Sequence, residues 1–490
     1  MAQYIALDVG AESGRVIVAT LGDDRLLLEE VHRFANGAVQ VGDSLYWDVL
    51  HLWNEIKNGL RKVAAAKHYD LRSLAVDTWG IDYALLDRTG GLVGNPHTYR
   101  DPRTTGMLEH ALEQLSDWEI YEQSGGIQFL SINTLYQLLA MVVSQDPALD
   151  GAHTLLMIPD LFNYWLTGYK ACEFTDTTTT QFYNSRSGEW SKALLDKLGI
   201  PTHIFPEVIM PGTRLGLVLS GVAQETGLTP LEVIAPATHD TASAVVAVPA
   251  SSAQFVWLSS GTWSLLGGIS PDPIVTPEAL EYNFSSYGGP GGVFLPWKNI
   301  MGLWLVQECR RVWVQAGEDL SYDDLTHMAD AAQPFLAVLN PDDPSFLAPK
   351  DMPGAIAAYC RDTGQRAPET KGEIVRVVLE SLALRYRWTL EKLARLQTRT
   401  FDVLHVVGGG SQNSLLCQFT ADATGVPVIA GPVEATAMGN AALQAVAMGE
   451  LASLDEARQL IRRCCDVVVY EPGQRSQWDD AWQLFEGLVA

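Results

Sequence analysis

The sequence lacks the two glycine motifs that most often mark a nucleotide site on a parallel sheet. No G-x-x-x-x-G-K-[ST] segment occurs, and no strand-like segment runs into G-x-G-x-x-G. The first absence disfavours a P-loop ATPase. The second disfavours a nicotinamide dehydrogenase, which would also need a ribose-binding acid about 20 residues beyond its fingerprint.

The chain is also poor in positive charge, in cysteine and in long apolar runs. Its 33 Lys and Arg against 58 Asp and Glu give a net charge of −25, which disfavours a nucleic-acid partner. The 6 cysteines show no C-x-x-C and no zinc-like spacing, so reduced thiols are expected. Because no run of about 18 uncharged apolar residues and no signal-like N-terminus occur, we expect a cytoplasmic protein without a membrane partner.

Three segments rich in glycine and hydroxyl residues are present instead. They are DVGAESGR at 8–15, SSGTW at 259–263 and VGGGS at 407–411, each at the end of an apolar run of strand length. Glycine lets backbone N–H groups approach a phosphate, and hydroxyls add donors. With 490 residues the chain fits two domains, so we expect the first two segments to hold ATP in a cleft between them.

The hydrophobic pattern predicts an α/β protein whose second half echoes the first. Strands are expected at 5–8, 16–21 and 26–34, then a helix ending near residue 66, and further strands at 74–77 and 83–87. A strand followed by a helix of small residues is expected around 235–244, near the domain junction. The strands expected at 255–262 and 264–268 repeat the strand, glycine turn and strand of the N-terminus. A long helix at 373–396, a strand at 403–407 and a helix from about 413 complete the pattern.

Two turns carry candidate phosphate-binding residues. Asp8 ends the first strand, where a carboxylate can orient Mg²⁺ through water, and Arg15 adds a fixed positive charge. The alternative is that Asp8 only caps the turn while Arg15 pairs on the surface. Thr262 can bind the transferring phosphoryl group, or can lie in a plain β-hairpin. Gly408–Gly410 can accommodate an adenosine against bare backbone, or can be only a strand-to-helix turn.

Asp240 is the strongest catalytic candidate. It lies with His239 and Thr241 where an apolar strand passes into a helix, beside the expected domain junction. A carboxylate there can serve as general base toward a sugar hydroxyl. The alternative is that Asp240 is the N-cap of the following helix. His239 alone is more often a structural histidine.

Further segments add to these turns in a fixed order. They are DTWGID at 77–82, YRD at 99–101, GIQF at 126–129, NTLYQL at 133–138, THDTASA at 238–244, LSSGTWS at 258–264, KNIMGLW at 298–304 and VGGGSQN at 407–413. Together with DVGAESGR they resemble the FGGY carbohydrate kinase family over nearly the whole chain.

The resemblance implies two actin-like, ribonuclease-H-like domains, 1–243 and 244–490, with a nucleotide- and sugar-binding cleft between them. It implies ATP contacts from Ala11, Glu12, Ser13, Gly14, Arg15, Thr262, Gln307 and Gly410. It implies ketose contacts from Gly80, His239, Asp240, Thr241 and Asn299.

The implied reaction uses ATP and Mg²⁺, with Asp240 taking the proton of the C1 hydroxyl of L-rhamnulose as that oxygen attacks the γ-phosphorus. A kinase for L-fuculose or another deoxyketose is the alternative within the family. A non-catalytic actin-like ATP-binding sensor, which needs no base at position 240, is the alternative outside it. The expected partners are a small-molecule ketose and ATP, and the oligomeric state is left open.

Overall fold

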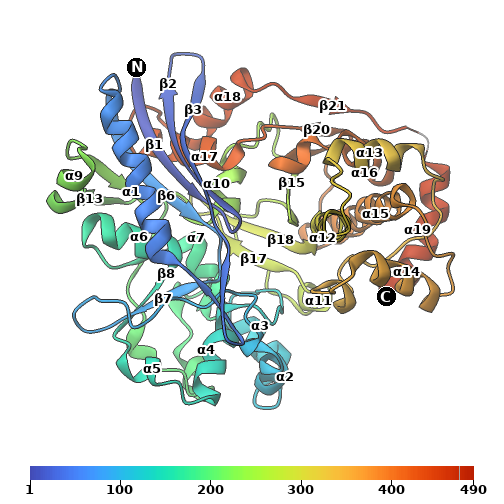
Figure 1. Cartoon of the computed structure of the whole chain (residues 1–490), viewed down its shortest axis with the longest axis horizontal. Helices are drawn as coiled ribbons and strands as arrows, with labels where there is room; N and C mark the ends of the chain where they lie inside the picture. Colours follow the sequence, from blue (N-terminus) through green and yellow to red (C-terminus); the bar gives the residue numbers. More distant parts are fainter. Residues whose placement is uncertain (474, 490) are drawn as a thin grey trace. The chain divides into compact units, whose positions relative to one another are not determined.

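The structure, a computed structural model, describes residues 1–473 and 475–489 and divides into two compact units (Figure 1). Unit 1 comprises Met1–Pro249, Ile269–Pro296 and Ala435–Cys464. Unit 2 comprises Ala250–Gly268, Trp297–Glu434 and the described part of Cys465–Ala490. The chain thus leaves and re-enters each unit, and the domain boundary expected between residues 243 and 244 stays a prediction.

Unit 1 is built on a six-stranded sheet with the order β13-β14-β6-β1-β2-β3. β1 (Ala2–Val9), β2 (Ser13–Leu21) and β3 (Leu26–Ala35) form the expected antiparallel meander. On the other side of β1, β6 (Leu71–Thr78) and β14 (Glu232–Ile234) are parallel, and β13 (Arg214–Leu217) is an antiparallel edge. The strands predicted at the N-terminus and at 74–77 are confirmed, each slightly longer than expected.

Helix α1 (Val49–Ala66) is the expected amphipathic helix that follows the meander. The Asp48 side chain accepts a hydrogen bond from the His51 backbone N–H at 3.0 Å and so caps its first turn. The residues that recur at helical spacing, Leu52, Ile56 and Leu60, are buried in the core of unit 1.

Helix α17 (Ala435–Met448) comes from late in the chain and packs against β1, β6 and α10 (Asp240–Val246). Gln444 donates to the Ile5 carbonyl oxygen at 3.0 Å and accepts from the Ser73 hydroxyl at 2.7 Å. A Cβ on Gly439 would overlap the Ser243 carbonyl oxygen of α10, so glycine is what lets the two helices approach.

Unit 1 also contains further helices and short strands. They are β4 (Ala38–Val41), β5 (Ser44–Trp47), β7 (Tyr83–Leu86), η1 (Pro102–Thr104), α2 (Met107–Leu112), α3 (Asp117–Gln123), α4 (Thr134–Val143), α5 (Pro147–Gly151), β8 (Thr154–Met157), α6 (Ile158–Thr167), β9 (Cys172–Glu173), α7 (Phe174–Thr177), η2 (Thr178–Thr180), β10 (Tyr183–Asn184), β11 (Glu189–Trp190), α8 (Lys192–Lys197), η3 (Thr202–Ile204), β12 (Val208–Ile209), α9 (Ser220–Thr226), α11 (Pro277–Glu281), β17 (Ser285–Gly288) and α18 (Leu454–Cys464).

In unit 2 the strands follow the order β18-β16-β15-β19-β20-β21. β15 (Phe255–Ser260) and β16 (Trp263–Gly267) are antiparallel, and β18 (Phe294–Met301) pairs antiparallel with β16 through its unit 2 residues. β19 (Val403–Val407) lies parallel to β15, and β20 (Val428–Ala430) parallel to β19, with β21 (Val468–Tyr470) antiparallel at the edge. The strand directions repeat those of unit 1, so the predicted internal echo is confirmed at the level of topology.

Helix α15 (Lys371–Gln397) is the long helix expected in unit 2. A capping box opens it, in which Thr370 and Glu373 bond each other's backbone N–H groups. Tyr386 of this helix and Ser264 of β16 share a buried hydrogen bond of 2.7 Å. The other elements are α12 (Trp304–Gln315), α13 (Tyr322–Ala331), η4 (Pro344–Phe346), α14 (Met352–Asp362), η5 (Gly409–Gln412), α16 (Ser414–Thr424) and α19 (Ser476–Val489).

Among the described residues, no helix combines the length and apolar character that a membrane crossing requires.

Candidate active site

The first glycine turn joins β1 to β2 in unit 1. The Gly10 N–H donates to the Ser13 carbonyl oxygen at 2.9 Å, and the Asn36 side-chain amide donates to the Gly10 carbonyl oxygen at 2.8 Å. Ala11 and Ser13 are partly exposed and Glu12 is exposed, so the tip of the turn is open to a ligand. A Cβ on Gly14 would overlap the Phe34 ring, so core packing already requires glycine at that position.

Asp8 on β1 and Arg15 on β2 lie opposite each other, on the two sides of this turn. One Arg15 guanidinium nitrogen lies 2.5 Å from an Asp8 carboxylate oxygen, and the two side chains are 17% and 9% exposed. Arg15 therefore forms a mostly buried ion pair with Asp8, and the roles of both residues toward phosphate and Mg²⁺ stay predictions.

Asp77 lies beside Asp8 on the parallel neighbour β6. It is fully buried and accepts a hydrogen bond of 2.5 Å from the Asn440 side-chain amide of α17. Burial, followed by the charge of Asp8, raises the pKa of Asp77 well above its ordinary value, while the Asn440 hydrogen bond opposes the rise. The two carboxylates therefore lie close enough to affect each other's ionisation.

Mg²⁺ in kinases is usually held by one or two carboxylates, several waters and the substrate phosphates. Among the described residues, no group of three or more His, Cys, Asp or Glu is placed to hold a metal. Asp8 beside Asp77 supplies anionic oxygens, and Arg15 already occupies one of them. These residues fit a metal that arrives with nucleotide phosphates and contacts Asp8 through water, rather than a cage of protein ligands.

Asp240 opens helix α10, six residues after β14 ends at Ile234. His239, not Asp240, occupies the N-cap position, so the alternative of an N-cap aspartate is wrong. The Asp240 side chain keeps 32% of its surface exposed and accepts a hydrogen bond of 3.1 Å from the Thr241 hydroxyl. Burial of its surroundings raises the pKa of Asp240 to about 6, and hydrogen bonds from Thr241 oppose the rise. A carboxylate with this pKa is ionised at neutral pH and accepts a proton more readily than an ordinary aspartate.

His239 lies between this carboxylate and the end of β6. Its Nε2 is 3.7 Å from an Asp240 oxygen, and its backbone pairs with Thr78 in an isolated parallel bridge. Burial lowers the pKa of His239 to about 4, so the ring is neutral at pH 7. A neutral imidazole offers one donor and one acceptor, which suits hydroxyl groups.

Gly80 follows β6 and adjoins the same histidine. A Cβ on Gly80 would come within 3.1 Å of the His239 ring, 3.1 Å of the Thr179 methyl and 3.2 Å of an Asp176 oxygen. The structure therefore brings together four of the residues that the resemblance assigned to the ketose: Gly80, His239, Asp240 and Thr241.

In unit 2, Thr262 forms the turn between β15 and β16. The Gly261 N–H donates to the Trp263 carbonyl oxygen at 2.9 Å, and the Thr262 carbonyl accepts from the backbone N–H groups of Gly302 and Trp304 at 3.2 and 3.1 Å. The turn is thus a hairpin tied to the start of α12, and the binding of a phosphoryl group by Thr262 stays a prediction.

Asn299 and Gln307 lie farther along the chain in unit 2, on β18 and on α12. Asn299 is on β18, opposite Leu265 of β16, and accepts a hydrogen bond of 3.1 Å from the Trp297 indole. Gln307 is on α12, and its buried Oε1 accepts no hydrogen bond from the described residues. An unsatisfied buried acceptor of this kind fits a ligand donor, which is consistent with the assignment of Gln307 to ATP.

The triple glycine follows β19. Gly408 has a φ of 82°, and a 3-10 turn, Gly409–Gln412, precedes helix α16, which is capped by Asn413. A Cβ on Gly410 would overlap the Ser260 side chain of β15, whereas nothing lies within 4 Å of the corresponding position on Gly409. Close approach of β15 thus explains Gly410, and Gly409 is the position that leaves open space.

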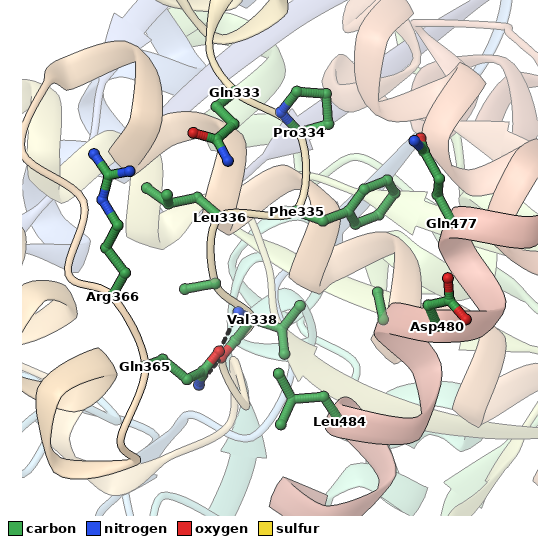
Figure 2. Close-up of a pocket in the computed structure, with 12 residues that line it drawn as sticks. Gln333, Pro334, Phe335, Leu336, Val338, Gln365, Arg366, Gln477, Asp480 and Leu484 are labelled. Atoms are coloured by element: carbon green, nitrogen blue, oxygen red, sulfur yellow. Dashed lines mark hydrogen bonds between the residues drawn. The ribbon is translucent and has the colours of Figure 1, made fainter.

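A cavity of about 630 Å³ lies elsewhere in unit 2 (Figure 2). Gln333, Gln365, Arg366, Gln477 and Asp480 contribute polar side chains to its lining, and Leu336, Val338 and Leu484 contribute apolar ones. It contains none of the predicted site residues, so it does not enter the candidate active site.

The chain matches known proteins over nearly its whole length. Residues 3–247 match "FGGY family of carbohydrate kinases, N-terminal domain", and residues 256–448 match the C-terminal domain of the same family. Proteins named rhamnulokinase are similar to it: one from Bacteroides thetaiotaomicron is 43% identical over 99% of both chains, and one from Halalkalibacterium halodurans is 41% identical over 96% of this chain and 99% of its own. A third, from Klebsiella pneumoniae, is 43% identical over 96% of this chain and 95% of its own.

The chain belongs to the FGGY family of carbohydrate kinases. It is therefore an ATP-dependent carbohydrate kinase. Among solved structures, this FGGY kinase shares its fold with a gluconate kinase from Lactobacillus acidophilus, at a TM-score of 0.82 and 17% identity over 100% of this chain and 97% of that one. A xylulose kinase from the same organism gives 0.83 and 16% over the same shares. The two-domain, actin-like and ribonuclease-H-like architecture expected from the sequence is confirmed.

Sequence reasoning missed several residues of the site. Asp77, Asp82, Asp176 and Thr179 are buried around the turn that carries Gly80, and Asn440 reaches Asp77 from α17. Asp77 and Asp82 lay within a quoted motif, but only Gly80 of that motif received a role. For Asn440, 363 residues from Asp77 along the chain, no local pattern could have supplied the signal.

Proposed function

We propose that this FGGY kinase transfers the γ-phosphoryl group of Mg·ATP to the C1 hydroxyl of L-rhamnulose, giving L-rhamnulose 1-phosphate and ADP in L-rhamnose catabolism. The similarity at 41–43% identity to proteins named rhamnulokinase, over nearly the whole length, carries the choice of ketose.

The environment of Asp240 supports its role as general base. In the proposed step the C1 hydroxyl gives its proton to the Asp240 carboxylate, its oxygen forms a bond to the γ-phosphorus, and the bond from that phosphorus to ADP breaks. A pKa of about 6 keeps the carboxylate ionised at neutral pH and raises its proton affinity above that of an exposed aspartate. Gly80, the neutral His239 and Thr241 surround this position and would, with Asn299, bind the ketose hydroxyls.

The proposed nucleotide contacts fall into two groups. The open tip Ala11–Glu12–Ser13, with Gly14 and Arg15 behind it, would meet phosphates from unit 1. Thr262, Gln307 and Gly410 would contact ATP from unit 2. Asp8 would orient Mg²⁺ through water, and the metal, when bound, would offset the charge of the phosphate oxygens.

A kinase for L-fuculose or another deoxyketose is the alternative within the family. A few positioned hydrogen bonds decide between such sugars, because a buried polar group left unpaired by the wrong isomer is costly. The ATP-binding sensor is set aside because the chain is a carbohydrate kinase.

The test is ADP release by the purified protein with Mg·ATP and a panel of L-rhamnulose, L-fuculose, L-ribulose, D-xylulose and glycerol. We expect the highest kcat/KM with L-rhamnulose and a loss of about 10² to 10⁴ in Asp240→Asn. A higher kcat/KM with another ketose overturns the substrate but keeps the mechanism. Turnover undiminished in Asp240→Asn overturns the base.

A further inference from the structure

Ile81, directly after Gly80, has a backbone conformation that its side chain disfavours. Its φ is 66°, in the left-handed region, where a β-branched residue is rare. The Asp82 N–H donates to the Gly80 carbonyl oxygen at 2.9 Å and closes a three-residue turn around Ile81. A turn of this hand is strained, so the surrounding structure must hold it in place.

Both peptide groups of Ile81 are held by side chains from other elements. Its N–H donates to the Thr179 hydroxyl oxygen at 3.0 Å, from η2. Its carbonyl oxygen accepts from the Thr134 hydroxyl at 2.6 Å and from the Gln137 amide at 3.3 Å, both on α4. The three side chains are almost completely buried, so water cannot replace them readily.

The residue after the turn is anchored equally firmly. One Asp82 carboxylate oxygen accepts from the Trp47 and Trp79 indoles at 2.6 and 2.9 Å and from the Tyr99 N–H at 3.2 Å. The other accepts from the Gln137 amide at 2.9 Å. Since Gln137 also donates to Ile81, the two anchors form one connected network within unit 1.

Thr179 is the member of this network that also bounds the space around Gly80. Its methyl group lies 3.1 Å from the position of a Gly80 Cβ, on the same side of the glycine as the His239 ring and Asp176. Its hydroxyl donates to the Asp176 carbonyl oxygen at 2.7 Å while it accepts from Ile81. The one side chain thus bonds the strained turn to η2 and packs beside Gly80.

We propose that Thr179 is a positioning residue for the ketose: its hydroxyl holds the strained Gly80–Ile81 turn so that Gly80 and His239 face the sugar in a fixed geometry. The inference rests on the proposed assignment of Gly80 and His239 to the ketose. Because the Thr179 hydroxyl bonds Ile81 and Asp176 and no residue assigned to the nucleotide, its removal acts on ketose binding and leaves ATP binding unchanged.

The experiment compares Thr179→Val, which keeps the shape and removes the hydroxyl, with Thr179→Ser, which keeps the hydroxyl. The matched control is Thr177→Val, because the Thr177 hydroxyl is buried two residues away and bonds no described residue. We expect Thr179→Val to raise KM for L-rhamnulose about tenfold with KM for ATP unchanged, and Thr179→Ser and Thr177→Val to stay close to the wild type.

Thr134→Val replaces Thr179→Val as the test variant if the latter does not fold. In Thr134→Val the Ile81 carbonyl still accepts a hydrogen bond from Gln137. It should raise KM for the ketose selectively by a smaller factor. Equal KM values for Thr179→Val and Thr177→Val overturn the inference, as does a rise in KM for ketose and ATP alike with a lowered Tm. Absence of ketose phosphorylation by the wild type overturns the proposed function itself, and with it this inference.

Discussion

The pH dependence of turnover tests the role of Asp240 most directly. With its pKa raised to about 6 by burial, the carboxylate is protonated below that pH and cannot accept the C1 proton. Activity should therefore rise with pH through about 6 and reach a plateau above about 7. At about pH 5 only about a tenth of the enzyme carries the ionised base, so kcat/KM for the ketose should fall about tenfold from its plateau.

His239 does not obscure this limb of the profile. Burial lowers its pKa to about 4, so the ring stays neutral over the whole range in which Asp240 titrates. The assay is direct measurement of ADP or sugar phosphate between about pH 5 and about pH 8, with saturating Mg·ATP and the ketose below its KM, so that the profile reports the free form of the base.

Thr241→Val gives the assignment a second test. The Thr241 hydroxyl donates to Asp240 and lowers its pKa, so its removal should move the midpoint of the acid limb to higher pH. A midpoint near the ordinary aspartate value of about 4 would refute the claim that burial raises the pKa. A midpoint near 6 that Thr241→Val leaves unmoved would assign the limb to another group.

Three further perturbations follow from the packing of the site. Gly410→Ala places a Cβ against Ser260, so it should destabilise unit 2 by about 1–3 kcal/mol and raise KM for ATP. Gly409→Ala is the control, because its Cβ would meet open space, and it should change neither quantity. Equal thermal unfolding of the two variants would contradict this expectation. Asn440→Ala removes the hydrogen-bond donor to the buried Asp77, so it should lower the free energy of unfolding by about 1–3 kcal/mol. Urea titration measures this change, and an unchanged unfolding midpoint would show that water replaces the amide. Chelation of Mg²⁺ with EDTA should abolish turnover and excess Mg²⁺ should restore it at fixed ATP; full activity in EDTA would remove Asp8 from its proposed role.

The strands and the long helices could be predicted because their signals are local. The apolar runs at 5–8 and 403–407 and the period of α1 and α15 depend on neighbouring residues only, and the structure confirms them with small shifts in their ends. The interleaving of the two units could not be predicted in the same way. Helix α17 returns to unit 1 from residue 435, and what places it there is the complementarity of Gly439 and Asn440 to distant partners.

The candidate site likewise has features that local sequence could predict and features that depend on distant residues. Asp240 was singled out because a carboxylate between a strand and a helix has a recognisable local context, and the structure places it there with a raised pKa. Gly14 and Gly410 were interpreted as glycines that contact ATP, yet Phe34 and Ser260 already exclude a Cβ at those positions. A glycine in a sequence shows that a side chain is absent, but not whether a ligand or a neighbouring strand requires the absence.

The repeated topology of the two units leads to a last prediction about Ile81. In both units a residue with a positive φ follows the parallel strand next to the central one: Gly408 directly after β19, at 82°, and Ile81 three residues after β6 ends at Thr78, at 66°. Glycine adopts a positive φ without strain, whereas Ile81 needs Thr179 to hold it. In an Ile81→Gly background the effect of Thr179→Val on KM for the ketose should therefore shrink from about tenfold to about twofold. The reason is that a turn with glycine at position 81 no longer needs the hydrogen bond to Thr179 to keep its conformation. A double-mutant cycle separates this coupling from the packing that Ile81→Gly also removes, and additive effects would mean that Thr179 acts on the sugar by a route other than the turn.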